Sequence, residues 1–326
     1  MIDGMINDLR EKLIDKKNFL SSYAQKYIPA EETLQILEEI QDALDRMDSG
    51  TYGVCEVCGD PIEEDRLQAN PLLRVCIGDY SAEQQKNLED DLTLAVKIQR
   101  NLLPSCSQVL AGWDIEFHYE PASIVSGDYC DLLQPDDKER SQFVIMGDVS
   151  GKGVAASMLM THLHAMFHTL VPFNLPVNEI LSRMNRILSE STIVNQFATL
   201  VLAKIREDGT VEISNAGHCQ PLHIKTGGTS ELASDGIPLG VLPDSGYSSR
   251  IISMQPGDVL ILYTDGLPEA MKDDDCFELS RILKYSGQFI QMNPGEIIQT
   301  ILAELNEFLD GTEKSDDLTL MVLKKK

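Results

Sequence analysis

Several aspartates stand beside glycine or serine at points where the chain is expected to leave a β-strand. Asp148 in MGDVSGKG and Asp265 in LYTDG directly follow apolar, β-rich runs, and Asp128 in SGDYCD and Asp316 in KSDDLTL have similar neighbours. Four carboxylates brought together would repel one another strongly unless cations neutralised them. Hard oxygen ligands favour Mg2+ or Mn2+, and four negative charges balance two divalent cations. The pattern therefore predicts a two-metal centre.

The alternative for each of these aspartates is an ordinary turn, because Asp-Gly is among the commonest turn dipeptides. Their joint occurrence at strand ends favours the metal centre. Gly151, Lys152 and Gly153 precede a predicted helix, whose first N–H groups could bind phosphate. The alternative is that these glycines only allow a tight backbone near the metals. Asp131 is either an outer metal ligand or a solvated acid at a strand end.

A second set of chemically active residues is a group of cysteines. Cys55 and Cys58 are separated by two residues, Cys76 follows 18 residues after Cys58, and Asp79 stands where a second cysteine pair would end. Thiolates at this spacing surround a tetrahedral Zn2+, and Asp is an allowed fourth ligand. The alternative is a former zinc ribbon held together by hydrophobic contacts. Both interpretations stay open.

The elements that must position these residues fall into two kinds. Apolar spacing predicts helices over 5–24 and 34–47, which form a helical hairpin, and another over 82–103 that Pro104 ends. Residues 51–81 are rich in loops. From about Trp113, short β-rich runs alternate with turns and with predicted helices at 153–171, 176–191 and 294–310. This mixture is typical of an α+β fold built from hairpins. The predicted domains are 1–50, 51–81, 82–104 and 105–326.

The composition excludes several classes of partner. The 326 residues include 52 acidic and 27 basic ones, for a formal net charge of −25. That charge argues against non-specific binding to nucleic acid or to an anionic membrane. No apolar run of about 18 residues predicts a membrane span, and the N-terminus does not resemble a secretory signal. Seven cysteines do not indicate a disulfide framework. We expect a cytoplasmic protein.

The segment DSGTYGVCEVCGDPIEEDRLQANPLLRVCIGD resembles the DksA/TraR zinc-finger family, and the match extends from the helical hairpin through Asp79. Several members of that family bind RNA polymerase. This sequence lacks the family's acidic hairpin tip, because the turn reads SYAQKYIPAEET, and its hairpin is short. The resemblance therefore implies a sensing or dimerising module rather than a polymerase modulator.

The segments IQRNLLP, SGDYCD, GDVSGKGVAASM, NAGHCQPL, YTDGLPEA and DDLTLMVLK resemble the SpoIIE/RsbU branch of the metal-dependent (PPM) serine/threonine phosphatases, from about Val96 to the C-terminus. The resemblance implies a four-layer αββα sandwich with two Mn2+ or Mg2+ ions between antiparallel sheets. It implies that Asp148 bridges both metals, helped by the Val149 carbonyl, and that Asp128 binds one metal. Asp265 and Asp316 would complete the other, and Asp317 ranks second to Asp316.

Two departures from the wider phosphatase family concern the leaving-group acid and the phosphate ligand. Ser150 stands where eukaryotic relatives carry a His, and the phosphate-binding Arg near the start of their domain has no counterpart. Both absences are usual in the SpoIIE branch. His218 in NAGH is assigned a structural role, with metal-bound water preferred as the acid.

The function that these resemblances imply is hydrolysis of a phosphoserine or phosphothreonine on a regulatory protein, by water activated between two metals. The implied substrate is an anti-anti-sigma (STAS) protein in a partner-switching pathway. The chain would be a homodimer through its N-terminal and linker helices, and its N-terminal module would regulate it. The alternatives are a DksA-like polymerase regulator and a non-catalytic scaffold with an inactive phosphatase fold.

Overall fold

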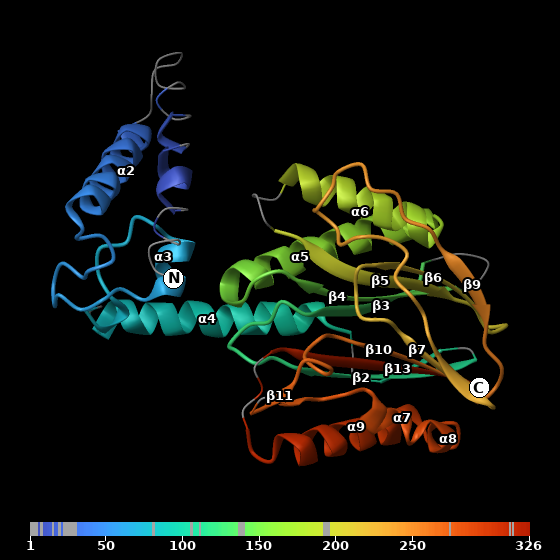
Figure 1. The fold of residues 1–326 in the computed structure, drawn as a ribbon. Helices are drawn as coiled ribbons and strands as arrows, with labels where there is room; N and C mark the ends of the chain where they lie inside the picture. The colour runs from blue at the N-terminus through green and yellow to red at the C-terminus, as the bar shows by residue number, and fades with distance from the viewer. Residues whose placement is uncertain are drawn as a thin grey trace. The chain divides into compact units, whose positions relative to one another are not determined.

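The structure is a computed structural model that describes residues 6, 9–14, 16–18, 21, 31–79, 82–104, 107–110, 112–135, 141–191, 196–273, 275–312, 314 and 316–326. The chain divides into two compact units, Met1–Thr93 and Leu94–Lys326, and each is described by itself (Figure 1). Helix α4 (Ala82–Leu102) begins in the first unit and ends in the second.

The first unit is helical around a small cysteine-containing loop region. The described residues between 6 and 21 that carry an assignment are helical, and they are followed by α2 (Glu31–Ser49), α3 (Glu64–Ala69) and the 3₁₀ turn η1 (Ile77–Asp79). Leu9 and Leu13 share a buried core with α2 and with the buried Cys55 and Cys76. The predicted helical N-terminal region is thus confirmed. Residues 22–30, which hold most of the expected hairpin tip, lie outside the described residues.

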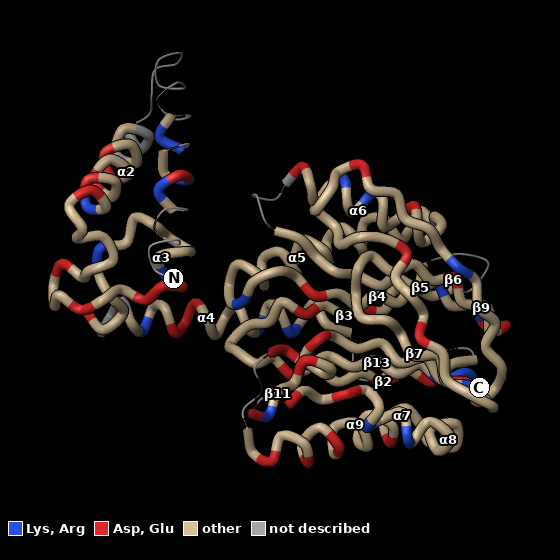
Figure 2. The backbone as a smooth tube through the Cα atoms, in the orientation of Figure 1, with Lys and Arg blue, Asp and Glu red and all other residues tan. Residues whose placement is uncertain are grey.

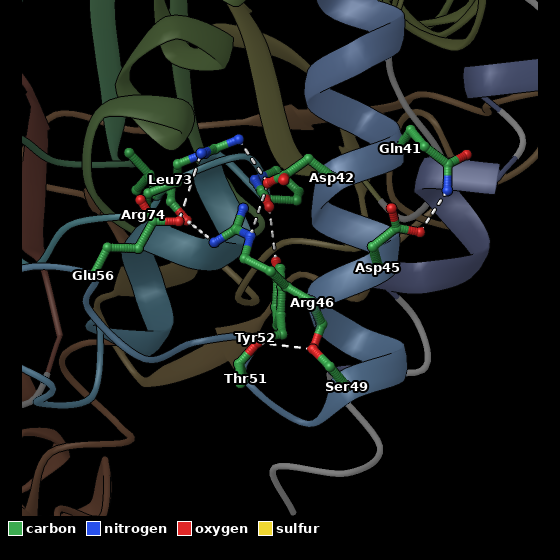
Figure 3. Close-up of polar contacts among 11 residues, drawn as sticks. Gln41, Asp42, Asp45, Arg46, Ser49, Thr51, Tyr52, Glu56, Leu73 and Arg74 are labelled. Atoms are coloured by element: carbon green, nitrogen blue, oxygen red, sulfur yellow. Dashed lines mark hydrogen bonds and ion pairs between the residues drawn. The ribbon is translucent and has the colours of Figure 1, made fainter.

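Polar contacts join the C-terminal end of α2 to the loop that follows (Figure 3). The Asp42 carboxylate accepts hydrogen bonds from Arg46 (3.2 Å) and from Arg74 (2.6 Å). Arg46 also donates to the carbonyl of Leu73 (3.2 Å), and Tyr52 donates to that of Pro71 (3.0 Å). These bonds hold the segment leading to Cys76 against the helix.

The second unit contains two large antiparallel sheets. The first, in the spatial order β1-β2-β13-β10-β7-β8, has six strands, and the second, β3-β4-β5-β6-β9, has five. The strands of the first are β1 (Ser107–Leu110), β2 (Trp113–Glu120), β7 (Leu222–Lys225), β8 (Gly228–Glu231), β10 (Val259–Tyr263) and β13 (Leu318–Lys325). Those of the second are β3 (Tyr129–Leu133), β4 (Gln142–Val149), β5 (Ala198–Ile205), β6 (Thr210–Ala216) and β9 (Arg250–Ser253). A short pair, β11 (Met271–Lys272) and β12 (Asp275–Cys276), is separate.

Helices cover the outer face of each sheet (Figure 1). Helices α5 (Gly153–Leu170) and α6 (Val177–Ser191), joined by the 3₁₀ turn η2 (Val171–Phe173), pack on the five-stranded sheet. Helices α7 (Ser280–Leu283), α8 (Ser286–Phe289) and α9 (Pro294–Leu309) pack on the six-stranded sheet. A third core lies between the sheets. The unit is therefore the four-layer αββα sandwich that the phosphatase resemblance implied.

Strand β4 shows why the sequence forms these layers. Its side chains alternate between two buried faces. Phe143 and Ile145 belong to the core under α5 and α6, whereas Val144 and Met146 belong to the core between the sheets. A strand buried on both faces reads as one apolar run, FVIM, and such a run carries no alternation that would assign its faces from sequence.

Helix α5 and the turn after it correct the expectation that the sequence holds no apolar run long enough to span a membrane. By length and composition alone, Gly153–Phe173 is apolar enough to cross a membrane, with a mean hydropathy of 1.2. Its buried residues, among them Met160, Leu163 and Phe167, instead pack in the core with β3 and β4. A helix buried between a sheet and a second helix needs the same apolar composition as a membrane span.

Candidate functional site

The four predicted aspartates come from both sheets. Asp128 directly precedes β3 and Asp148 lies near the end of β4, and these two strands are paired in the five-stranded sheet. Asp265 follows β10 and Asp316 precedes β13, which are paired in the six-stranded sheet. Figure 2 shows acidic positions gathered near β11, where ends of the two sheets meet.

Asp128 is held by hydrogen bonds that cross from one sheet to the other. Its Oδ2 accepts from the hydroxyls of Thr319 (2.6 Å) and Thr264 (2.9 Å). All three side chains are buried. These two threonines were not identified as site residues from the sequence, although Thr264 directly precedes Asp265 and Thr319 lies three residues after Asp316. The bonds orient the Asp128 carboxylate and leave its other oxygen available for a cation.

Two glycines allow the segments of this site to approach one another. A Cβ on Gly127 would lie 3.2 Å from the Val149 carbonyl oxygen and 3.3 Å from Asp148 Oδ1, so both oxygens border the same small space. A Cβ on Gly266 would lie 1.9 Å from the carbonyl oxygen of Asp317, which excludes any side chain there. The Asp265 turn and the Asp316 segment are therefore in direct contact.

Asp316 and Asp317 have different surroundings. The Asp316 carboxylate forms an ion pair with the exposed Lys152 (3.0 Å). The Asp317 carboxylate instead accepts two backbone N–H groups, from Ala122 (2.7 Å) and Gly127 (2.9 Å). Asp317 therefore positions the loop that leads to Asp128, which leaves Asp316 as the better ligand of the pair.

Burial and mutual repulsion make three of the carboxyl groups, those of Asp128, Asp148 and Asp265, hard to ionise. Burial raises the pKa of Asp148 to about 7, and the nearby Asp265, Asp316 and Asp317 add to the shift. Burial, followed by the charge of Asp316, also raises the pKa of Asp265. The pKa of Asp128 lies well above its usual range, chiefly because of burial. Such a cluster is stabilised as carboxylates only when positive charge is supplied.

The donor set fits divalent cations. It consists of four carboxylates and a backbone carbonyl, all hard oxygen ligands of the kind that Mg2+ and Mn2+ prefer. Among the described residues, the groups whose ligand atoms all lie within 4.8 Å are the cysteine cluster and Asp131 with His164 and His168. The four aspartates are spaced more widely, which suits two cations better than one.

The glycine–lysine segment that precedes α5 lies beside this centre through Lys152. Gly151 has a φ of +94° and Gly153 a φ of +72°, a backbone region that other residues rarely adopt. A Cβ at either position would meet no atom within 4 Å, so conformation rather than space requires glycine. The segment remains a candidate for phosphate binding.

Ser150 and His218 do not have the surroundings of an acid catalyst. The Ser150 hydroxyl accepts the Phe197 N–H (3.0 Å), which ties the end of β4 to the start of β5. His218 is buried, and its Nδ1 lies 2.8 Å from the Thr199 hydroxyl. Burial lowers the pKa of His218 to about 4, so the imidazole is neutral at pH 7. A neutral, buried imidazole agrees with the structural role expected for His218.

Gln99, in the C-terminal part of α4, contacts the same loop. Its buried side chain donates to the Ser126 carbonyl (2.7 Å) and accepts the Ser126 N–H (3.1 Å). Ser126 in turn accepts the Asp128 N–H through its hydroxyl (3.0 Å). From the sequence, Gln99 was included only as part of the segment IQRNLLP and was assigned no contact. Its hydrogen bonds connect α4 to a candidate metal ligand.

We expect Asp316 and Asp317 to differ in a matched pair of substitutions. Asp316→Asn removes a ligand charge and should weaken Mn2+ binding by roughly 100-fold. Asp317→Asn leaves that ligand charge in place and keeps an oxygen acceptor for one of the Ala122 and Gly127 N–H groups, so it should cost about tenfold or less. Isothermal titration with Mn2+ measures both. Equal losses, or a larger loss for Asp317→Asn, would reverse the assignment.

The cysteine cluster of the first unit is compact. Asp79 Oδ2 accepts from Cys55 Sγ (2.9 Å) and Cys76 Sγ (3.2 Å), and Cys58 Sγ lies 3.6 Å from Cys76 Sγ. The three sulfurs and a carboxylate oxygen all lie within 4.8 Å of one another. Hydrogen bonds from these thiols lower the pKa of Asp79. Asp79 thus lies where a fourth zinc ligand is needed, and the cluster fits a zinc site.

Comparisons with known proteins identify relatives of both the phosphatase domain and the cysteine-containing segment. Residues 138–326 match the family described as Stage II sporulation protein E (SpoIIE), and residues 50–78 match the prokaryotic dksA/traR C4-type zinc finger. The chain is 25% identical over 245 residues to the phosphoserine phosphatase RsbU of Bacillus subtilis, covering 74% of this chain and 72% of RsbU. General stress protein 16O of the same organism is 45% identical over 58 residues, 18% of this chain and 32% of that protein.

A solved structure has a similar fold. The SiaA-PP2C domain of Pseudomonas aeruginosa superposes with a TM-score of 0.65 at 20% identity, over 76% of this chain and all of that one. The SpoIIE match covers more than half of the chain, and its segment holds Asp148, Asp265 and Asp316. The chain therefore belongs to the SpoIIE family of PPM serine/threonine protein phosphatases and carries a dksA/traR-type zinc finger ahead of its phosphatase domain.

Proposed function

We propose that this protein hydrolyses phosphoserine or phosphothreonine on a regulatory partner protein, with two Mn2+ or Mg2+ ions held by Asp128, Asp148, Asp265, Asp316 and the Val149 carbonyl. The observation that carries the proposal is the convergence of four aspartates from two sheets around Gly127 and Gly266. The likeness to a phosphoserine phosphatase supports the substrate class. A STAS-type anti-anti-sigma protein is the partner that we propose.

The residues around the four aspartates would have different roles in this site. Thr264 and Thr319 orient Asp128, and Asp317 holds the loop before it. Lys152 presents an exposed ammonium group beside Asp316, where it would attract a phosphate. Divalent cations, when bound, would supply an activated water and screen the charge of the phosphate.

The regulatory part of the proposal concerns α4 and the N-terminal module. We propose the predicted division of the chain, with a hairpin at 1–50, a finger at 51–81 that binds zinc, a linker helix at 82–104 and a phosphatase domain at 105–326. Movement of the linker would reach Asp128 through the hydrogen bonds of Gln99 to Ser126. The enzyme would act in the cytoplasm, independently of nucleic acid and membrane.

The experiment that tests the activity measures phosphate release from a phosphoserine-containing STAS protein, with and without Mn2+. We expect release that requires Mn2+ and that Asp265→Asn abolishes. A phosphotyrosine protein serves as the control substrate and should stay intact. A small chromogenic ester is a poor substitute, because docking of the protein substrate contributes to specificity. Inert wild-type protein with a panel of phosphorylated STAS proteins would contradict the proposal.

We also expect a homodimer that depends on an apolar stripe of α4. Leu94 and Ile98 are 55% and 50% exposed and lie one helical turn apart, which is the spacing of a helix–helix seam. Light scattering should give a dimer for the wild type and a monomer for Leu94→Glu/Ile98→Glu, because buried unpaired charges prevent packing.

Arg100→Glu is the matched control for this dimer. Arg100 is exposed on the same helix, and its substitution changes the charge by the same −2 as the double variant. The control should remain dimeric. A monomeric wild type, or dissociation of the control alone, would exclude the seam.

A further inference from the structure

Helix α5 and strand β3 bring together a second group of metal-ligating side chains. His164 and His168 lie one helical turn apart on α5, and Asp131 lies on the neighbouring β3. His168 Nε2 is 2.7 Å and His164 Nδ1 is 3.3 Å from the same oxygen, Asp131 Oδ2. The three ligand atoms all lie within 4.8 Å of one another. The centroids of the two imidazole rings are 4.0 Å apart.

This cluster is distinct from the four-aspartate centre. Side chains of a strand alternate between its faces, so Asp131 shares a face with Tyr129, which packs in the core under α5. Cys130 belongs to the opposite core, between the sheets, on the side where Asp128 contacts Thr264 and Thr319. The structure thus excludes both interpretations of Asp131 offered from the sequence, since it is neither a ligand of the centre between the sheets nor a solvated acid.

Hydrogen bonding alone explains this arrangement poorly. The Tyr129 hydroxyl also donates to Asp131 Oδ2 (3.0 Å), so three groups converge on one oxygen that has two lone pairs. Oδ1 accepts the Leu132 N–H (2.7 Å). The carboxylate is buried, with only 7% of its side chain exposed, and its charge needs a positive partner. The Tyr129 hydroxyl also lies 3.4 Å from His164 Nδ1. A cation shared by Asp131 Oδ2, His164 Nδ1 and His168 Nε2 would meet the need for positive charge.

We propose that Asp131, His164 and His168 form a binding site for one borderline divalent cation of the Zn2+ type. Imidazole with carboxylate is a ligand set that zinc accepts, and two histidines four residues apart on a helix present their nitrogens on one side. Tyr129 and the Leu132 N–H would orient the carboxylate from behind. His168, with 39% of its side chain exposed, gives the cation a path from solvent. The cation would fasten α5, which begins next to Lys152, to the strand that follows Asp128.

The test is titration calorimetry with Zn2+ on the full chain, saturated beforehand with Mn2+ and with its finger already loaded with zinc. We expect the wild type to bind one more equivalent of Zn2+ than His168→Ala. His162→Ala is the matched control, because His162 lies on the same helix outside the cluster, and it should bind as the wild type does. Equal Zn2+ uptake by the wild type and His168→Ala would overturn the proposal.

A second variant separates a metal site from a hydrogen-bonded clamp. His168→Gln keeps an N–H donor for Asp131 but lacks the imidazole lone pair, so it should fold with the melting temperature of the zinc-free wild type and lose the extra equivalent. Zn2+ at 100 times its Kd should raise the melting temperature of the wild type by about 5–10 °C relative to this variant. The same zinc-dependent shift in His168→Gln would show that the cation binds elsewhere.

Discussion

Replacing Asp148 with Asn should abolish catalysis and, at the same time, stabilise the protein that lacks Mn2+ or Mg2+. The side chain would be a ligand of the cations that activate the water, and loss of several kcal/mol of transition-state stabilisation corresponds to about a thousandfold or more in rate. Mn2+-dependent phosphate release from the protein substrate measures the first effect. The second follows from repulsion, because Asp148 is crowded by Asp265, Asp316 and Asp317.

The size of the stability effect depends on pH. The pKa of Asp148 is raised from 3.8 to about 7 in the folded state, so folding without cations favours the protonated form. This contribution to stability is complete below pH 3.8 and is lost as the pH rises through 7. Asn carries no charge, so the stability of Asp148→Asn relative to the wild type should increase as the pH rises from 3.8 to 7. We expect about 1–3 kcal/mol at pH 8, after allowance for partial exposure, and no difference near pH 4.

Thermal unfolding of both proteins at pH 4 and pH 8, without added Mn2+ or Mg2+, measures this difference. Asp244→Asn is the control, because Asp244 is exposed and lies outside the cluster. Saturating Mn2+ should reverse the order of stability at pH 8, since only the wild type retains its full set of ligands. A variant that is less stable than the wild type at pH 8 without cations would contradict the predicted crowding.

The second large effect concerns the zinc finger. Cys55 and Cys76 are buried in the same core as Tyr52, Ile62 and Leu67, so zinc release would open the centre of the first unit. Structural zinc contributes on the order of 10 kcal/mol to the folding of small fingers. Cys55→Ser should therefore lose bound zinc and much of the helical signal of residues 1–93, measured by elemental analysis and circular dichroism.

Substitutions of Asp79 provide the sharper test, because they distinguish a zinc site with four ligands from one formed by the three cysteines alone. Asp79→Ala should weaken zinc binding, and Asp79→Cys should strengthen it, because a fourth thiolate completes the set that zinc prefers. Asp60→Ala is the control, since only the backbone N–H of Asp60 contacts Cys58. If Cys55→Ser retained the wild-type helical signal, the finger would be held by hydrophobic contacts, which is the alternative left open by the sequence.

Much of the fold could be predicted from sequence, because the amphipathic and apolar runs are long. Helices were expected at 153–171, 176–191 and 294–310, and the structure has Gly153–Leu170, Val177–Ser191 and Pro294–Leu309. The short α3 and β1 were not anticipated. A six-residue helix and a four-residue edge strand contain too few residues to show a period, and their neighbours in the fold decide whether they form.

The sequence by itself determined the chemistry: the aspartates in the phosphatase segments and the three cysteines with Asp79 name oxygen and sulfur ligands, because metal preference depends on donor type. Only the tertiary structure decided which other residues form hydrogen bonds or ion pairs with these aspartates. Thr264 and Thr319 reach Asp128 from the other sheet, and Asp131 turns away from it toward His164 and His168. No local pattern encodes such contacts, because they depend on which faces of distant strands and helices are packed together.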